Sequence, residues 1–115
     1  MSATAEYNDR VTSYARAVVA GQVEGVGELH RLACARHLKD IERSFEQTST
    51  FPYYWDPEAA ERVLTYAETL TIAEGAEPRP VKLIPAQIFD IGCTVGWKKV
   101  ANGCRRFTLI RTALV

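Results

Sequence analysis

Two histidines and a cysteine lie at a spacing that could hold a metal ion. His30, Cys34 and His37 occupy positions i, i+4 and i+7, so they share one face of a helix. Nitrogen and sulfur ligands of this kind can bind zinc, but a structural zinc site takes four ligands. No further cysteine or histidine lies nearby in the sequence. We therefore expect a small core thiol between two partly buried histidines, and no metal site.

Other catalytic signatures are absent from the sequence. There is no GxSxG or HExxH motif, and the glycines Gly21, Gly25 and Gly27 lack the lysine and hydroxyl residue of a phosphate loop. The carboxylates of Glu58 and Glu61 fall at a predicted helix start, where they suit the helix dipole. From its residues alone the chain is expected to be no enzyme and to carry no cofactor.

Gln87 is a candidate nucleotide-binding residue. It follows Pro85 at the start of a predicted helix and precedes Phe89. A glutamine amide offers one acceptor and two donors, which can meet both the amino group and N7 of adenine. The alternative is a solvated glutamine without a ligand.

The net charge of zero hides an uneven distribution of charge. All 14 acidic residues lie within residues 6–90, where only nine basic residues leave a balance of −5. Residues 91–115 contain no acid and sum to +5. This basic end could contact an anion, a partner or nucleic acid, or could pair with the acidic helices. Its basic residues are Lys98, Lys99, Arg105, Arg106 and Arg111.

The densest aromatic cluster lies in the middle of the chain. It comprises Phe51, Tyr53, Tyr54 and Trp55. Aromatic side chains that gather on a surface commonly anchor a protein partner. These four residues are therefore candidate partner-binding residues.

Hydrophobic periodicity and capping residues predict four helices. We expect them over about 9–20, 25–45, 57–72 and 86–95. The second helix should bury an apolar face, and Asn102-Gly103 should form a tight turn before a strand over 105–115. Trp97 and Phe107 should be core residues. The expected apolar face consists of Leu29, Leu32, Ala33, Leu38, Ile41 and Phe45.

These elements predict a single domain over residues 1–115. Its class should be mainly α with a small β element: three to four helices in a body of about 9–95, then a basic C-terminal β-hairpin or strand of about 96–115. Apolar runs are too short to span a membrane, and no signal peptide is evident. With three widely spaced cysteines, we expect a cytoplasmic protein with reduced thiols.

Several segments, in order, resemble the N-terminal region of the large terminase subunit of tailed bacteriophages. The resemblance runs from about Tyr14 to Val115. The segments are Tyr14-Ala15, 18–21, 32–43, 51–56, 82–89, 96–98 and 103–107.

The resemblance implies a viral protein of the DNA-packaging motor, a P-loop ATPase joined to a nuclease. Gln87 matches the family's adenine-recognising glutamine, although Ala86 stands where the family usually has tryptophan. Residues 107–115 resemble the strand that leads into the phosphate loop, and the sequence stops there. ATP and Mg²⁺ would belong to the full-length family, so we expect this chain alone not to hydrolyse ATP.

The sequence leaves two interpretations open. In the first, the chain is part of a terminase large subunit and binds the rest of the packaging motor in the host cytoplasm. In the second, it is a standalone phage or prophage protein derived from terminase. That protein would bind and inhibit a host nucleoprotein machine, for example as an anti-CRISPR protein.

Overall fold

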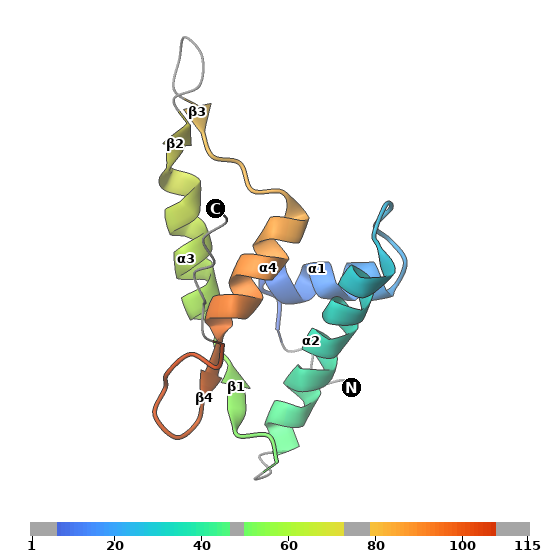
Figure 1. Ribbon diagram of the computed structural model, residues 1–115, viewed down its shortest axis with the longest axis vertical. Coiled ribbons are helices and arrows are strands. Elements are labelled where there is room, and N and C mark those ends of the chain that lie inside the picture. The colour runs from blue at the N-terminus through green and yellow to red at the C-terminus, as the bar shows by residue number, and fades with distance from the viewer. Residues whose placement is uncertain (1–6, 47–49, 73–78, 108–115) are drawn as a thin grey trace, which may run out of the picture.

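Helices make up most of the structure. The computed structural model describes residues 7–46, 50–72 and 79–107. The prediction of a mainly α protein with a small β element is confirmed (Figure 1). The elements are α1 (Arg10–Val19), α2 (Glu28–Glu46), β1 (Tyr53–Trp55), α3 (Pro57–Thr69), β2 (Thr71–Ile72), β3 (Arg79–Pro80), α4 (Pro85–Gly96) and β4 (Trp97–Lys99). None of the helices in the described part of the chain could span a bilayer.

The helix starts follow from local capping. The Asp9 carboxylate accepts the Thr12 amide at the start of α1, and Asp56 accepts the Ala59 amide at the start of α3. The first turns of α3 and α4 each contain a proline. Proline has no amide N–H to donate, but amides in the first turn of a helix have no partner within the helix, so nothing is lost there. These starts agree with the predicted ones. The third helix ends earlier than predicted, because the chain enters β2 after Thr69.

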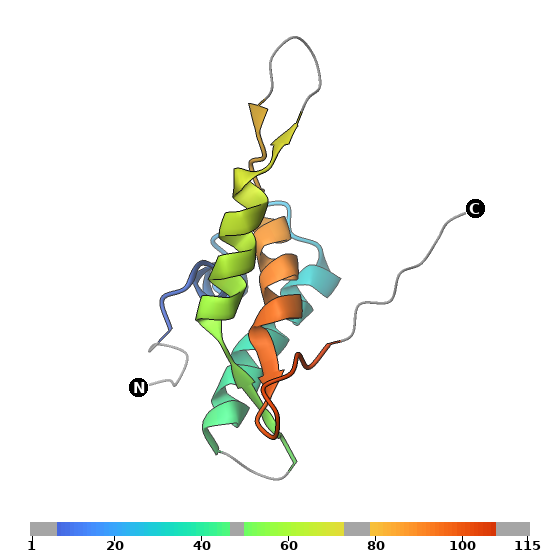
Figure 2. The ribbon, with the colours of Figure 1, turned by 90° about the vertical axis from the view of Figure 1, so that its left-hand side faces the viewer.

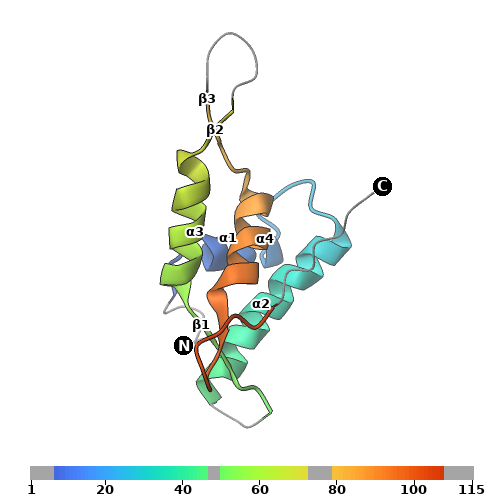
Figure 3. The same ribbon diagram turned by 60° about the vertical axis from the view of Figure 1, so that its left-hand side comes forward.

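The helices form a bundle in which α4 is central. It packs against both α3 and α1, and α1 also packs on α2 (Figure 3). The largest fully buried side chains come from α1, α2, α3 and β4. They include Trp97, Ile41, Leu64, Val11 and Val18.

A small antiparallel sheet closes one end of this bundle. It pairs β1 with β4, with Tyr54 opposite Lys98 and Trp55 opposite Trp97 (Figure 2). The predicted turn at Asn102-Gly103 is present, since Gly103 has a φ of 70° and the Cys104 amide bonds the Asn102 side chain. Of the predicted strand over 105–115, Arg105 forms a single bridge to Lys98. Residues 108–115 lie outside the described residues.

The apolar face predicted for α2 is largely wrong. Leu29 and Leu32 are 84% and 53% exposed, and Ala33 and Phe45 are also exposed, while Ile41 is buried as expected. The helix instead buries Cys34, His37 and Asp40. Burial of two polar side chains is stable only where partners satisfy them, and these partners come from distant parts of the chain.

Candidate functional site

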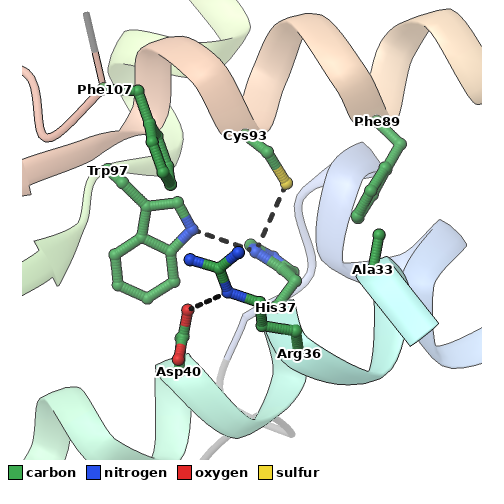
Figure 4. A pocket seen from close by; sticks show the side chains of 8 residues that line it. All are labelled: Ala33, Arg36, His37, Asp40, Phe89, Cys93, Trp97 and Phe107. Carbon is green, nitrogen blue, oxygen red and sulfur yellow. Dashed lines mark hydrogen bonds and ion pairs between the residues drawn. The ribbon is translucent and has the colours of Figure 1, made fainter. Parts of the chain in front are cut away.

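His37 lies at the centre of a buried polar network. Its side chain is 3% exposed. The indole nitrogen of Trp97 donates to Nδ1 at 3.2 Å, and the Cys93 sulfur lies 3.5 Å from the same atom (Figure 4). On the other side of the ring, Nε2 lies 3.1 Å from the hydroxyl of Thr12. Because indole can only donate, Nδ1 must accept, and the neutral ring carries its proton on Nε2.

The network continues from Thr12 to a carboxylate. With Nε2 of His37 donating to Thr12, the Thr12 hydroxyl donates to Asp9 at 3.0 Å. The other oxygen of Asp9 accepts the indole nitrogen of Trp55 at 3.3 Å. Every hydrogen bond in this series, from Trp97 through His37 and Thr12 to Asp9, therefore has a matched donor and acceptor.

The direction of these bonds argues against nucleophilic catalysis. A general base must accept the proton of its nucleophile, but Nε2 of His37 donates to Thr12. Thr12 is also fully buried, so no substrate can reach its hydroxyl. Burial lowers the pKa of His37 to about 4, with Asp9 and Asp40 opposing the shift. The imidazole is therefore a neutral structural group near pH 7.

The thiols near His37 are unreactive for the same physical reason. Burial raises the pKa of Cys34 to about 11 and that of Cys93 further still. A thiol in that state is a poor nucleophile and a poor metal ligand. His30 instead bonds the Tyr14 hydroxyl at 2.9 Å. Within the described part of the chain, no group of three or more potential ligands could hold a metal ion.

Asp40 anchors a second set of contacts, next to His37. Its carboxylate is 8% exposed and accepts a bond of 3.1 Å from Arg106. Arg36 and Arg43 lie 3.6 and 3.9 Å from it. The guanidinium of Arg106 also stacks 4.3 Å from the ring centre of Tyr53. This set fixes the chain after β4 to the side of α2.

A cavity of about 140 Å³ lies between α2 and α4 beside these groups. Its wall is mostly aromatic and aliphatic, and Arg36 and Asp40 form its polar side (Figure 4). Phe107, predicted as a core residue, lies at the cavity and is only half-buried.

The basic residues of the C-terminal end fall into two classes. Lys98 bonds Asp56 at 2.7 Å, and Arg106 bonds Asp40, so these two charges are neutralised. Lys99 and Arg105 are exposed. Arg111 lies outside the described residues.

The predicted aromatic patch does not form on the surface. Phe51 and Trp55 are each 3% exposed because they pack in the core, and Tyr53 is half-buried under Arg106. Tyr54 points the other way and is 37% exposed. Alternation along β1 explains this division, because successive side chains of a strand point to opposite faces.

Gln87 has a local role in the structure. Its side-chain oxygen accepts the Ile84 amide at 3.1 Å and so caps α4. The side chain is exposed. A groove of about 390 Å³ adjoins this helix start and is lined by residues 84–86, by residues 23–27 and by Tyr14 and His30. Gln87 is not among its lining residues.

The sequence did not point to Asp9, Thr12 or Asp40 as parts of one site. Asp9 also caps the start of α1. Buried polar residues require partners, but the sequence does not reveal that His37 and Asp40 lie on the buried face of α2.

Comparison of the chain with protein-family models, curated proteins and solved structures finds no match.

Proposed function

We propose that this chain is a terminase large-subunit-like N-terminal region, and that it serves as a structural part of a DNA-packaging ATPase motor. Its role in that motor is to provide a rigid support, while ATP and Mg²⁺ are handled by other parts. The observation that carries the proposal is where the separate segments of the resemblance meet.

Four of these segments contribute to one contiguous set of contacts. Segment 32–43 supplies His37 and Asp40, and segment 96–98 supplies Trp97, which bonds His37 at 3.2 Å. Segment 103–107 supplies Arg106, which bonds Asp40 at 3.1 Å. Segment 51–56 supplies Trp55, whose ring centre lies 4.6 Å from that of His37. If these segments derive from one ancestral fold, they are expected to lie together in this way.

The chemistry of the network agrees with a supporting role. Its histidine is neutral, its thiols are protonated and its hydroxyl is buried, so it holds segments together without reacting. Catalysis of phosphoryl transfer depends on a phosphate cradle and a metal ion. We assign both to the rest of the motor.

The reading frame beyond Val115 provides the first test. It should continue into a loop that ends in Gly-Lys-Ser or Gly-Lys-Thr. A stop codon there would overturn the proposal in favour of a standalone protein.

A second test uses the phage or prophage that encodes the chain. The double variant Asp40→Ala/Trp97→Ala should lower the yield of DNA-filled heads. It removes the bond between Trp97 and His37 and the bond between Arg106 and Asp40, which join these segments. Tyr66→Ala, a change at a 68% exposed residue of α3, should leave that yield unchanged. Equal yields from the two variants would contradict a role in packaging.

One observation favours the alternative of a protein-binding inhibitor. Leu29 and Leu32 project from the first turns of α2 and are 84% and 53% exposed. Exposed apolar residues of this size suit a protein partner. A standalone inhibitor would bind a host nucleoprotein machine, such as a CRISPR effector, through this end of α2. Leu29→Ser/Leu32→Ser should abolish such binding and leave packaging unaffected.

A further inference from the structure

The cavity between α2 and α4 has aromatic walls that the fold itself holds in place. Phe89 and Trp97 form two of them, and both side chains are buried. The Trp97 ring is fixed by its 3.2 Å bond to His37, and the Phe89 ring stands nearly perpendicular to the same imidazole. Phe107 adds a third ring. An aromatic ligand would meet rings that are already positioned, which lowers the cost of binding.

The size of the cavity limits the apolar part of a ligand to one ring. Its volume is about 140 Å³. An apolar cavity of about 150 Å³ in another protein takes up benzene, so a single six-membered ring matches this space. Ala33 and Arg36 form a side of the cavity and are both exposed. A ring can therefore enter from this side without opening the core.

Charge at the exposed side favours an anion. The Asp40 carboxylate is 8% exposed and is already held by Arg106 at 3.1 Å. The Arg36 side chain is 62% exposed and approaches Asp40 through Nε, at 3.6 Å (Figure 4). Among the described residues this ion pair is the one polar contact of Arg36, which leaves both terminal NH₂ groups available. Two such parallel donors match the two oxygens of a carboxylate.

We propose that this cavity binds a small aromatic carboxylate, with its ring among Phe89, Trp97 and Phe107 and its carboxylate on Arg36. A purely apolar ligand would leave the guanidinium unused, and an aromatic ammonium ion would meet it with the same charge. Benzoate is the simplest member of this class, with one ring and one carboxylate. The inference does not rest on the packaging assignment, because it uses only the contacts of this cavity.

Titration of the full chain with benzoate, followed by proton–nitrogen correlation NMR, tests the proposal. The chain contains two tryptophans, which give two indole N–H signals. Trp97 lines the cavity and Trp55 does not, so benzoate at millimolar concentration should shift the Trp97 signal saturably and far more than the other. Benzyl alcohol keeps the ring without the carboxylate, and benzylammonium reverses the charge. Both should bind about fivefold more weakly than benzoate, or worse.

Ala33→Leu tests whether the cavity is the site. The larger side chain should fill the space and abolish the shift, and leucine suits an exposed helical position. Ala35→Leu is the matched control, because Ala35 is also exposed on α2 but does not line the cavity. It should leave the affinity for benzoate unchanged. Well-dispersed spectra of both variants would show that both fold.

Arg36→Gln tests the contact with the carboxylate, independently of the cavity-filling variant. It should weaken benzoate binding by about fivefold and leave benzyl alcohol binding unchanged. Arg36→Lys should have an intermediate effect, because lysine keeps the charge but loses the planar pair of donors. Arg31→Gln removes the same charge from another exposed position of α2, outside the cavity lining, and should have no effect.

Three results would overturn the proposal. The first is the absence of a saturable shift of the Trp97 signal. The second is benzyl alcohol binding as tightly as benzoate, or Arg36→Gln weakening benzoate no more than Arg31→Gln, either of which would mean that the cavity does not recognise an anion. The third is equal weakening by Ala33→Leu and Ala35→Leu, which would place the ligand elsewhere. None of these results bears on whether the chain belongs to a packaging motor.

Discussion

The indole nitrogen of Trp97 donates a hydrogen bond of 3.2 Å to Nδ1 of His37, although the residues lie 60 positions apart in the sequence. This bond places the imidazole proton on Nε2, which in turn fixes the direction of the bond to Thr12. One contact between α2 and β4 thus determines the donor and acceptor roles along the whole buried network.

Stability should fall as the pH drops from about 6.5 to about 4. His37 binds its proton with a pKa of about 4 when folded, against 6.5 for the unperturbed side chain, because burial disfavours the cation. In that pH range the unfolded chain binds more protons than the folded one. The loss amounts to about 3 kcal/mol of the free energy of unfolding, measurable by urea denaturation at a series of pH values.

His37→Asn provides the control for this prediction. Asparagine retains an acceptor for Trp97 and does not titrate. The free energy of unfolding of the variant should therefore vary much less between pH 6.5 and 4.5. Burial raises the pKa of Asp56, but its bonds from Lys98 and Ala59 and the nearby positive charges together lower it. The bond from Arg10 lowers the pKa of Glu68, so the contributions of both carboxylates are lost at lower pH. An equally steep decline in the variant would show that His37 is not the titrating group.

Thr12→Val should destabilise the protein more than Thr12→Ser. The Thr12 hydroxyl accepts from His37 and donates to Asp9, and the side chain is fully buried. Valine preserves the volume but leaves the Nε2 donor of His37 unsatisfied, at a cost of about 1–3 kcal/mol. Serine keeps both bonds and loses one methyl group, at a cost of about 1 kcal/mol. Urea denaturation that ranks valine as the more stable variant would contradict the network.

Local signals in the sequence were enough to predict most of the helices. Asp9, Asp56-Pro57 and Pro85 act within one helical turn of themselves, so the starts of α1, α3 and α4 depend little on the rest of the chain. The turn at Asn102-Gly103 is local in the same sense.

The site could not be predicted, because its energetics depend on distant partners. Apolarity favours Leu29 and Leu32 for the inner face of α2, yet His37 and Asp40 are buried there. Their burial is stable because Thr12, Trp97 and Arg106 supply hydrogen bonds from 25 to 66 positions away. β1 was missed for a related reason: it is a strand only because β4 pairs with it.

Gly96→Ala should destabilise the junction between α4 and β4. A Cβ at this position would lie 2.5 and 2.7 Å from two ring carbons of Trp55. That ring is buried and bonded to Asp9, so it cannot move aside easily. We expect a loss of about 1–3 kcal/mol in thermal or urea unfolding.

Gly27→Ala is the matched control for this substitution. Gly27 has no atom within 4 Å of the added methyl group, and its φ is not positive. Its effect should stay within about 0.5 kcal/mol. If the two substitutions cost the same, contact with Trp55 is not the cause.

Removal of the Arg106 charge should cost less than a buried ion pair usually does. Arg106→Met keeps the aliphatic packing but removes the 3.1 Å bond to Asp40. A carboxylate left alone would cost about 3–5 kcal/mol, but Arg36 and Arg43 remain within 4 Å of Asp40. We therefore expect about 1–2 kcal/mol.

A double-mutant cycle with Asp40→Ala tests this arrangement directly. The coupling energy between positions 106 and 40 should be about 1–2 kcal/mol, since the two side chains are largely buried and in direct contact. The cycle with Arg43→Met should give less than about 0.5 kcal/mol, because Arg43 is 43% exposed and 3.9 Å away. A larger coupling for Arg43 than for Arg106 would mean that Asp40 is held chiefly from within α2, and that the chain after β4 is not anchored by this ion pair.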